Sequence, residues 1–372
     1  MTKIGITGQA GFIGTHLYNF FGLKKDEVLR IPFEDNFFED NSKLEDFVKQ
    51  CDVIIHLSAL NRHNDPQTIY DTNILLVKKL LKALDSTGSK PHILFSSSTQ
   101  EERDNMFGKS KRKGRELLAK WTKENNAKFS GLIIPNVFGP FGNPYYNSVV
   151  ATFSHQLTHN EEPKIEIDAQ LKLIYIGELV ELIWKVIKDK DSREDYKIPH
   201  TSEKKVTEIL DLIRIYKTSY MDKGVFPVLN NKFEVNLFNA FRCYMDIPNH
   251  YPVKLTRNTD ERGTFVETIK TGLGGQVSFS TTKPGITRGN HYHTRKIERF
   301  TVIKGKALIQ LRRIGTDKIM NFDLDGNEPS YVDMPIWYTH NITNVGDEEL
   351  YTIFWINEFF DPDDPDTFIE KV

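Results

Sequence analysis

Three histidines and one glutamate in the last quarter of the chain have the residue types and spacing of a metal site. His291 and His293 stand two positions apart, so in a β-strand both imidazoles face the same side. Glu298 follows a turn predicted at residues 294–296, and His340 comes from a later segment. Three imidazoles and one carboxylate suit a divalent transition metal. Surface histidines on a β-hairpin are the alternative, because the chain has 11 histidines.

The residues around these ligands resemble the two motifs of the cupin family. Residues 285–305 match the first motif in the spacing of its glycines, histidines and glutamate, and residues 335–344 resemble the second. Trp337 stands where the family usually has glycine, while His340 keeps the place of the ligand. The resemblance implies a β-barrel in which His291, His293, Glu298 and His340 bind one divalent metal ion, with zinc the expected metal.

A glycine-rich turn at the front of the chain predicts a dinucleotide site. Residues 3–7 form an apolar strand pattern, and an amphipathic helix pattern follows directly. The spacing G-x-x-G-x-x-G between them lets the backbone approach a pyrophosphate at the N-terminus of that helix. A glycine-rich turn without a ligand is the alternative. The cofactor contacts predicted in this turn are Gly8, Gly11, Phe12, Ile13 and Gly14.

The next strands extend the cofactor prediction. The second predicted strand, residues 27–31, lacks the terminal carboxylate that usually binds the ribose 2′-hydroxyl of NAD, and it carries Arg30. A guanidinium there favours a 2′-phosphate, so NADPH is the predicted cofactor, with a solvated Arg30 as the alternative. The strand at residues 52–57 is apolar, as in a parallel sheet covered on both faces. Further cofactor contacts are predicted at Leu57, Ser58, Ala59 and Asn73.

A serine cluster and a lysine follow the fourth predicted strand. Residues 96–100 read Ser-Ser-Ser-Thr-Gln, and residues 107–111 read Phe-Gly-Lys-Ser-Lys. This segment resembles the extended short-chain dehydrogenase/reductase (SDR) family, whose members carry Ser or Thr and then Tyr-x-x-x-Lys. The resemblance implies that Ser98 holds a substrate carbonyl by a hydrogen bond and that Lys111 contacts the nicotinamide ribose. It also implies a nicotinamide-pocket wall formed by Pro135, Asn136 and Val137.

Position 107 departs from the SDR pattern, because phenylalanine has no proton to donate. In the family this position is a tyrosine that protonates the carbonyl oxygen as hydride arrives at carbon. Three interpretations stay open: an engineered residue that traps a complex, a relay through water or Ser98, or loss of reduction. Tyr145 and Tyr146 are further candidates for the proton donor. The candidate catalytic residues are therefore Ser98, Phe107 and Lys111.

The pattern of elements around these residues predicts two domains, as the length of 372 residues also suggests. Alternating strands and helices in residues 1–246 predict an α/β, Rossmann-like, doubly wound parallel sheet of the extended SDR type. Short strands and turns in residues 253–372 predict an all-β cupin barrel. Two prolines in residues 246–252 separate the two patterns.

Composition excludes several classes of partner. A net charge of -2 gives no reason to expect nucleic acid or an anionic membrane. We find no apolar run of the roughly 18 residues that span a bilayer and no signal-peptide pattern. Two isolated cysteines, Cys51 and Cys243, fit a reducing compartment. We therefore expect a soluble, cytoplasmic protein, with the acidic residues 361–366 as a solvated tail.

Residues 260–267 resemble a motif of cupin epimerases that act on 4-keto-6-deoxy nucleotide sugars, and residues 288–291 resemble another. The first motif includes Arg262, which with Arg288 and Lys283 would suit a diphosphate, although surface cations are the alternative. In those metal-free epimerases the histidine that matches His291 is the base. A metal-bound imidazole is not free to act as a base, and the complete set of four ligands favours metal binding here.

Together the two halves resemble bifunctional capsular polysaccharide enzymes with an N-terminal reductase and a C-terminal cupin. The resemblance implies that the cupin epimerises C3 of a UDP-2-acetamido-2,6-dideoxy-4-keto-hexose. The reductase would then reduce C4 with NADPH to the L-talose derivative, for capsule or O-antigen. A UDP-sugar substrate and a homodimer are expected. An epimerase-only enzyme, or a nucleotide-sugar-binding protein whose reductase is disabled by Phe107, is the alternative.

Overall fold

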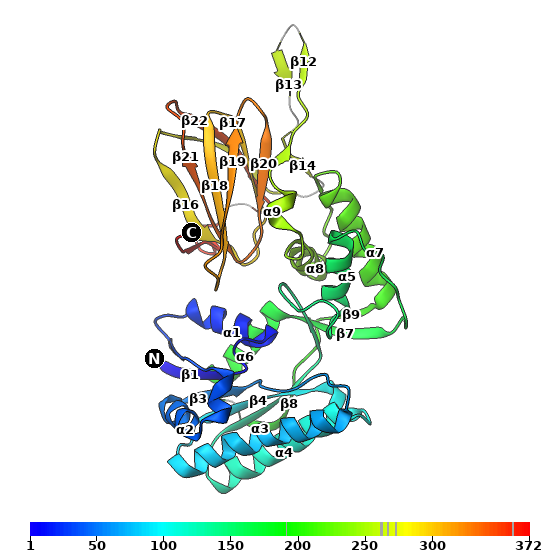
Figure 1. Ribbon diagram of the computed structural model, residues 1–372, viewed down its shortest axis with the longest axis vertical. Helices are drawn as coiled ribbons and strands as arrows, with labels where there is room; N and C mark the ends of the chain where they lie inside the picture. The colour runs from blue at the N-terminus through cyan, green and yellow to red at the C-terminus, as the bar shows by residue number, and fades with distance from the viewer. Residues whose placement is uncertain (191, 261–262, 266–267, 272–273, 359–360) are drawn as a thin grey trace. The chain divides into compact units, whose positions relative to one another are not determined.

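The computed structural model describes residues 1–190, 192–260, 263–265, 268–271, 274–358 and 361–372, and it describes no side chains for 258–260 and 263–265. The chain forms two compact units (Figure 1). The first comprises residues 1–138 and 170–204, and the second comprises residues 139–169 and 205–372. The proposed boundary near residue 250 thus falls inside the second unit, and a division into functional domains there stays a prediction.

The first unit is built on a six-stranded sheet whose neighbouring strands are all parallel. Strand β1 lies between β2 and β3, so the chain changes direction across the sheet at β1, where Rossmann-like folds bind ligands. This confirms the predicted parallel α/β sheet. The strands in spatial order are β2 (Val28–Ile31), β1 (Thr2–Thr7), β3 (Val53–His56), β4 (His92–Ser98), β5 (Phe129–Ile134) and β8 (Arg193–Lys197).

Helices cover both faces of this sheet (Figure 1). One face carries α2 (Asn41–Gln50), α3 (Pro66–Thr87) and α4 (Met106–Glu124), and the other carries α1 (Phe12–Gly22) and α6 (Ile176–Lys188). Side chains cap the starts of the first three, through Asp40, Asp65 and Asn105. Short pieces complete the unit: η1 (Asp35–Glu39), η2 (Thr99–Glu102), β6 (Asn136–Phe138), β7 (Gln170–Tyr175) and β9 (Ser202–Lys205).

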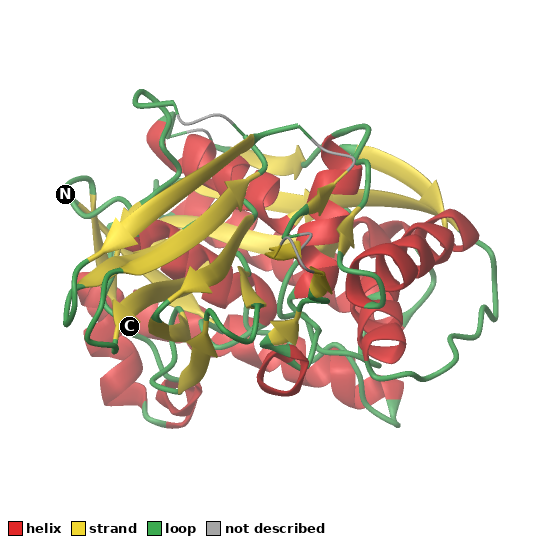
Figure 2. Ribbon diagram, turned by 90° about the horizontal axis from the view of Figure 1, so that it is seen from above, coloured by secondary structure: helices red, strands yellow, loops and turns green. Residues whose placement is uncertain are grey.

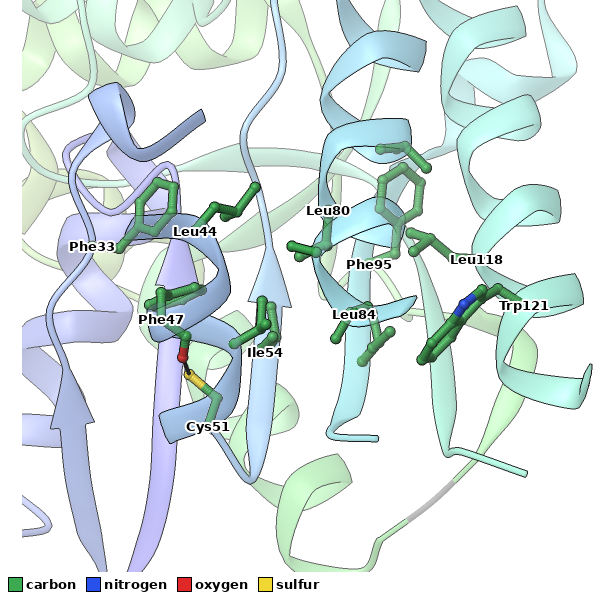
Figure 3. Packing of buried hydrophobic residues seen from close by; sticks show 14 of the residues in the cluster. Phe33, Leu44, Phe47, Cys51, Ile54, Leu80, Leu84, Phe95, Leu118 and Trp121 are labelled. Carbon is green, nitrogen blue, oxygen red and sulfur yellow. Dashed lines mark hydrogen bonds between the residues drawn. The ribbon is translucent and has the colours of Figure 1, made fainter. Parts of the chain in front are cut away.

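The apolar core of the first unit fills the space between the sheet and helices α2, α3 and α4 (Figure 3). Phe47, Ile54 and Leu84 are at most 1% exposed. Burying a side chain of this size contributes about 1.5–3 kcal/mol relative to leaving it in water. Cys51 is buried at the edge of the cluster, and its thiol donates to the carbonyl of Phe47 at 3.2 Å. The cysteine is therefore part of the core.

The second unit combines helices with two antiparallel sheets. Figure 2 draws all described helices of the chain in red and all described strands in yellow. Its helical elements are α5 (Val149–Thr158), α7 (Val206–Tyr216), η3 (Lys217–Met221), α8 (Lys232–Arg242) and α9 (Ile247–His250). One five-stranded sheet has the order β11 (Val253–Lys254), β20 (Ser330–Met334), β17 (Glu298–Lys304), β22 (Leu350–Ile356), β15 (Gln276–Thr282). The other has the order β19 (Ile319–Asp325), β18 (Lys306–Arg313), β21 (Tyr338–Asn344), β16 (Thr287–Tyr292), β23 (Phe368–Ile369).

Two short pairings also occur, β12 (Asn258–Asp260) with β13 (Gly263–Phe265) and β10 (Val225–Phe226) with β14 (Lys270–Thr271). The prediction of a mostly β region with antiparallel strands is confirmed, whereas closure into a barrel stays a prediction. In the described part of the chain, no helix has the length and apolar character needed to cross a membrane.

A buried polar network joins the helices of the second unit to its sheets. The guanidinium of Arg299 donates to both carboxylate oxygens of Asp333 at 2.7 and 3.0 Å. The hydroxyls of Tyr220 and Tyr251 donate to the same carboxylate. Arg242 on α8 donates to the carbonyl of Met334 at 3.1 Å. These contacts explain why residues 205–250 belong to the same compact unit as the β region.

Candidate cofactor and metal sites

The glycine-rich turn between β1 and α1 has a backbone that only glycine fits. Gly8 has a φ of +71°, and a Cβ there would lie 2.9 Å from the backbone nitrogen of Ser58. A Cβ on Gly14 would lie 2.2 Å from the carbonyl oxygen of Gly8. No side chain caps the start of α1, whose N-cap residue is Gly11. The first N–H groups of the helix are therefore available to a ligand anion.

The structure brings the predicted turn residues next to the end of β3. The N–H of Leu57 donates to the carbonyl of Thr7 at 3.1 Å. Among the described residues, the side-chain oxygens of Gln9 and Ser58 are buried without a hydrogen-bond partner. Buried polar atoms are normally paired, so these two oxygens point to a polar ligand. The turn, with its glycines and orphaned oxygens, fits a dinucleotide.

Two predicted cofactor residues also have protein partners, and their contact with a cofactor stays a prediction. The carboxamide of Asn73 accepts from the N–H of Leu60 at 2.7 Å and donates to the carbonyl of Leu60 and the hydroxyl of Ser110. Asn73 thereby ties the loop after β3 to α4. Arg30 donates to the carbonyl of Tyr18 at 3.0 Å, and its guanidinium lies 4.1 Å from the centre of the Tyr18 ring. The preference for NADPH stays a prediction.

Lys111 and residue 107 lie side by side on α4, as their spacing predicts. The Lys111 ammonium lies 5.6 Å from the centre of the Phe107 ring and donates to the carbonyl of Ser96 at 2.9 Å. Lys111 is 4% exposed. Its burial lowers the pKa to about 8, against the opposing effect of Glu101. The Ser98 hydroxyl oxygen accepts from the N–H of Gln100 at 3.2 Å, an arrangement that leaves its proton free to donate.

Pro135, Asn136 and Val137 follow β5, the neighbour of the strand that ends at Ser98. The register pairs Ser98 with Ile134, so Pro135 comes directly after the residue beside Ser98. Asn136 is exposed, and its side chain donates to the carbonyl of Lys172 at 3.2 Å. These positions keep the three residues at the same edge of the sheet as Ser98.

An ion pair that the sequence analysis missed links the loop after Ser98 to α4. The guanidinium of Arg115 contacts both carboxylate oxygens of Glu101, at 3.0 and 2.8 Å. The Ser97 hydroxyl donates to the same carboxylate. Glu101 is 6% exposed. No local pattern indicates this pair, because the two residues belong to different elements.

His291, His293, Glu298 and His340 form a compact cluster within the second unit. One ligand atom of each residue lies within 4.8 Å of those of the others. Oε2 of Glu298 lies 3.0 Å from Nε2 of His293 and 3.2 Å from Nε2 of His340. Strand β16 ends at Tyr292, so His293 lies just beyond it. The pairing of β16 with β21 shifts register between Gly289 and His291, where Asn290 has a φ of +58°, so the strand has a bulge directly before these ligands.

The chemistry of the cluster fits a divalent metal ion. The Nε2 atoms of His293 and His340 and Oε2 of Glu298 are buried and have no hydrogen-bond partner among the described residues. Burial, reinforced by the nearby His340, lowers the pKa of His291 to about 4, so this imidazole stays neutral. Burial opposes ionisation of Glu298, but contacts with His293 and His340 lower its pKa far below the usual value. Imidazole nitrogens and a carboxylate oxygen are the donors that zinc-type ions prefer.

Trp337 occupies a backbone conformation that explains the glycine of the cupin motif. Its φ is +62°, in the left-handed region where a side chain costs about 1–2 kcal/mol. Its ring stacks on Tyr292 with centroids 5.5 Å apart, and its backbone N–H donates to the carbonyl of His293 at 2.8 Å. Packing therefore offsets the strain, and His340 keeps its place in the cluster.

The expectation of a solvated acidic tail is wrong at Asp366. Asp361, Asp363 and Asp364 are exposed as expected, but Asp366 is 4% exposed. Its carboxylate accepts from the backbone N–H groups of the turn that follows His293. Burial is possible because the carboxylate is fully hydrogen-bonded.

The residues suggested for the diphosphate are only partly described. Arg262 and the core of the 260–267 motif lie outside the residues whose side chains are described. Arg288 and Lys283 are exposed. A role for these cations stays a prediction.

The parallel sheet, the glycine-rich turn and the buried Lys111 of α4 define an SDR-type nucleotide-binding protein, and comparison with known proteins agrees. The chain belongs to the NAD dependent epimerase/dehydratase family, which matches residues 4–198. Residues 258–368 match the polysaccharide biosynthesis C-terminal domain. Along its whole length the chain is similar to UDP-2-acetamido-2,6-beta-L-arabino-hexul-4-ose reductase of Pseudomonas aeruginosa, with 32% identity over 98% of each chain. The predicted pairing of a reductase-type front with a polysaccharide-biosynthesis region is confirmed.

Solved structures give the same result. The chain is 34% identical to the capsular polysaccharide assembling protein CapF from Staphylococcus aureus. The match covers 100% of both chains and has a TM-score of 0.62. UDP-glucose 4-epimerase from Thermotoga maritima is 21% identical, with a TM-score of 0.52 over 58% of this chain and 83% of that one. The second likeness concerns the fold alone.

Proposed function

We propose that the chain is a bifunctional nucleotide-sugar enzyme of capsule or O-antigen synthesis. In this proposal the β region is a cupin that epimerises C3 of a UDP-2-acetamido-2,6-dideoxy-4-keto-hexose. The front region reduces C4 with NADPH and yields the L-talose derivative. The observation that carries the proposal is the similarity over 98% of the chain to a reductase of such a keto sugar.

The two reactions share one chemical feature, the 4-ketone. It acidifies the proton on C3, because the carbanion becomes an enolate, and it is also the acceptor for hydride. NADPH supplies that hydride when bound. The chain supplies a hydrogen bond to the carbonyl oxygen from Ser98, whose proton is free, and a buried cation from Lys111. Water or Ser98 then takes over the proton transfer that a tyrosine performs in other members of the family.

The metal ion would be held by His291, His293, Glu298 and His340. When bound, it would polarise the keto oxygen or organise the barrel. The orphaned ligand atoms of this cluster support metal binding independently of the family resemblance. We propose zinc as the ion and a homodimer as the assembly.

Incubation with the 4-keto sugar in D2O, with and without NADPH, tests the proposal. Deuterium at C3 together with oxidation of NADPH is the expected result. Deuterium at C3 without oxidation of NADPH would show that the chain is an epimerase only. The presence of Phe107 in place of the proton donor favours this second candidate. Absence of both signals, with the sugar still bound, would instead support a nucleotide-sugar-binding protein.

A further inference from the structure

We propose that Asp366 is a positioning residue that fixes the tautomer and direction of the His293 imidazole. It does so as the centre of a clamp, which we define as residues 364–370. The inference rests on the metal site of the proposed function, but it concerns contacts that the protein makes by itself.

The first contact is between the His293 ring and the backbone of Asp366. Nδ1 of His293 lies 2.5 Å from the carbonyl oxygen of Asp366. A carbonyl can only accept, so Nδ1 carries a hydrogen, and in the neutral ring Nε2 then carries the lone pair. That Nε2 atom lies 3.0 Å from Oε2 of Glu298, in the cluster. The Asp366 carbonyl thus selects the tautomer that can bind a metal through Nε2, as outer-shell acceptors commonly do.

The second contact fixes the carbonyl itself through the Asp366 side chain. Its carboxylate accepts from three successive backbone N–H groups, those of Thr294 at 3.1 Å, Arg295 at 3.0 Å and Lys296 at 3.0 Å. The Thr294 hydroxyl donates at 2.6 Å. Asp366 therefore holds the turn directly after His293 with its side chain and the imidazole with its backbone. Hydrogen bonds to a buried carboxylate are strong, so rotation of the carbonyl would break several at once.

The rest of the clamp follows the ligand-bearing strand. The Lys296 ammonium donates to the carbonyl of Pro365 at 2.7 Å. Strand β23 pairs with β16, with Ile369 beside His291. The N–H of Glu370 donates to the carbonyl of Asn290 at 2.9 Å. The clamp thereby covers the whole stretch 290–296, which contains two of the four cluster residues.

Asp364 supplies a matched control, because it lies in the same segment and contacts the same turn. Its carboxylate pairs with Arg295 at 2.9 Å, but its side chain is 67% exposed. In the described part of the chain, its hydrogen bonds and ion pair go to Arg295, whereas Asp366 bonds the His293 ring. Asp364→Ala therefore removes a carboxylate from the clamp without removing the restraint on the imidazole.

The test measures Co²⁺ binding to the full chain by competition with a chelator and by the visible spectrum of the bound ion. Asp366→Ala should weaken Co²⁺ binding by about 10–100-fold and change the spectrum. Asp366→Asn should bind more tightly than Asp366→Ala, because its amide oxygen can still accept. Asp364→Ala should leave affinity and spectrum unchanged. A lower melting temperature for Asp366→Ala, with unchanged affinity and spectrum, would reduce Asp366 to a structural residue and overturn the proposal.

A second readout needs no metal. Imidazole ¹⁵N shifts of the metal-free protein, assigned with His293→Gln, should report the Nδ1–H tautomer at His293 and a mixture in Asp366→Asn. A wild-type protein that keeps this tautomer but binds no Co²⁺ would refute the metal site of the proposed function and leave the positioning role standing. An unchanged tautomer in Asp366→Asn and Asp366→Ala would overturn the inference whether or not metal binds.

Discussion

The ammonium of Lys111 lies 5.6 Å from the centre of the Phe107 ring, one turn away on the same face of α4. In the SDR pattern the ring at this place carries a hydroxyl, and the lysine supports it. Here Lys111 is kept, buried and bonded to the Ser96 carbonyl, beside a ring that has no proton to give. The site thus retains its cation and its Ser98 hydroxyl but lacks the usual acid.

Restoring that acid should increase reduction. Phe107→Tyr adds a hydroxyl at the place of the family's proton donor, and general acid catalysis contributes about 10²–10⁴-fold. We expect NADPH oxidation with the 4-keto sugar to rise within that range, measured by absorbance at saturating NADPH. Phe107→Leu is the control, since it adds no proton and should stay near the starting rate. An unchanged rate in Phe107→Tyr would contradict our account of the missing acid.

The burial of Lys111 should make stability depend on pH. The folded pKa is lowered from 10.5 to about 8, so below pH 8 the folded state carries the full penalty for a buried cation. Between pH 8 and 10.5 the folded state releases the proton before the unfolded state does, so the free energy of unfolding rises with pH. Relative to Lys111→Met, the wild type should gain about 3 kcal/mol across this range.

Urea unfolding of both proteins at pH 7 and pH 10 measures this gain. Lys120→Met is the matched control, because Lys120 lies on the same helix with a side chain that is 73% exposed. Its difference from wild type should be nearly the same at both pH values. If the difference in free energy of unfolding between wild type and Lys111→Met is also the same at pH 7 and pH 10, then Lys111 is not buried as a cation.

Loss of one cluster residue should abolish metal binding. His340→Ala removes an imidazole that is 0% exposed and whose Nε2 lies 3.2 Å from Glu298. Metal analysis of purified protein should find one ion per wild-type chain and none per variant chain. This loss is larger than the about 10–100-fold loss of metal affinity that follows when a residue contacting a ligand is changed. His155→Ala, a histidine of the same unit outside the cluster, should keep its metal. Equal metal content in the two variants would place the ion elsewhere.

The ion pair between Glu101 and Arg115 should matter for stability. Glu101→Gln leaves a mostly buried guanidinium without its carboxylate, and such losses cost about 3–5 kcal/mol. We expect a loss near the lower end of that range in denaturant unfolding, and a smaller loss in the double variant Glu101→Leu/Arg115→Met. Glu116→Gln, in an exposed pair with Lys113, should change stability by less than about 1 kcal/mol. Similar losses of stability in Glu101→Gln and Glu116→Gln would show that the buried pair contributes no more to stability than the exposed pair.

The sequence by itself determined the features that depend on local spacing. The glycines at positions 8 and 14 predicted a turn that only glycine can form, and the structure has that turn. The strand and helix alternation predicted the parallel sheet, because periodicity follows from which faces are buried. The spacing of His291 and His293 predicted that both rings face one point, and the cluster has them there, although His293 lies just beyond the end of the strand.

Only the tertiary structure decided which distant residues support these features. Asp366 reads as a solvated acid in the sequence, yet it is buried against a turn some 70 positions earlier. Nothing in the local sequence indicates that the carboxamide of Asn73 bonds to Leu60 and Ser110. Burial and pairing between residues far apart in the chain depend on how the strands and helices pack, and such contacts leave no period or spacing in the sequence.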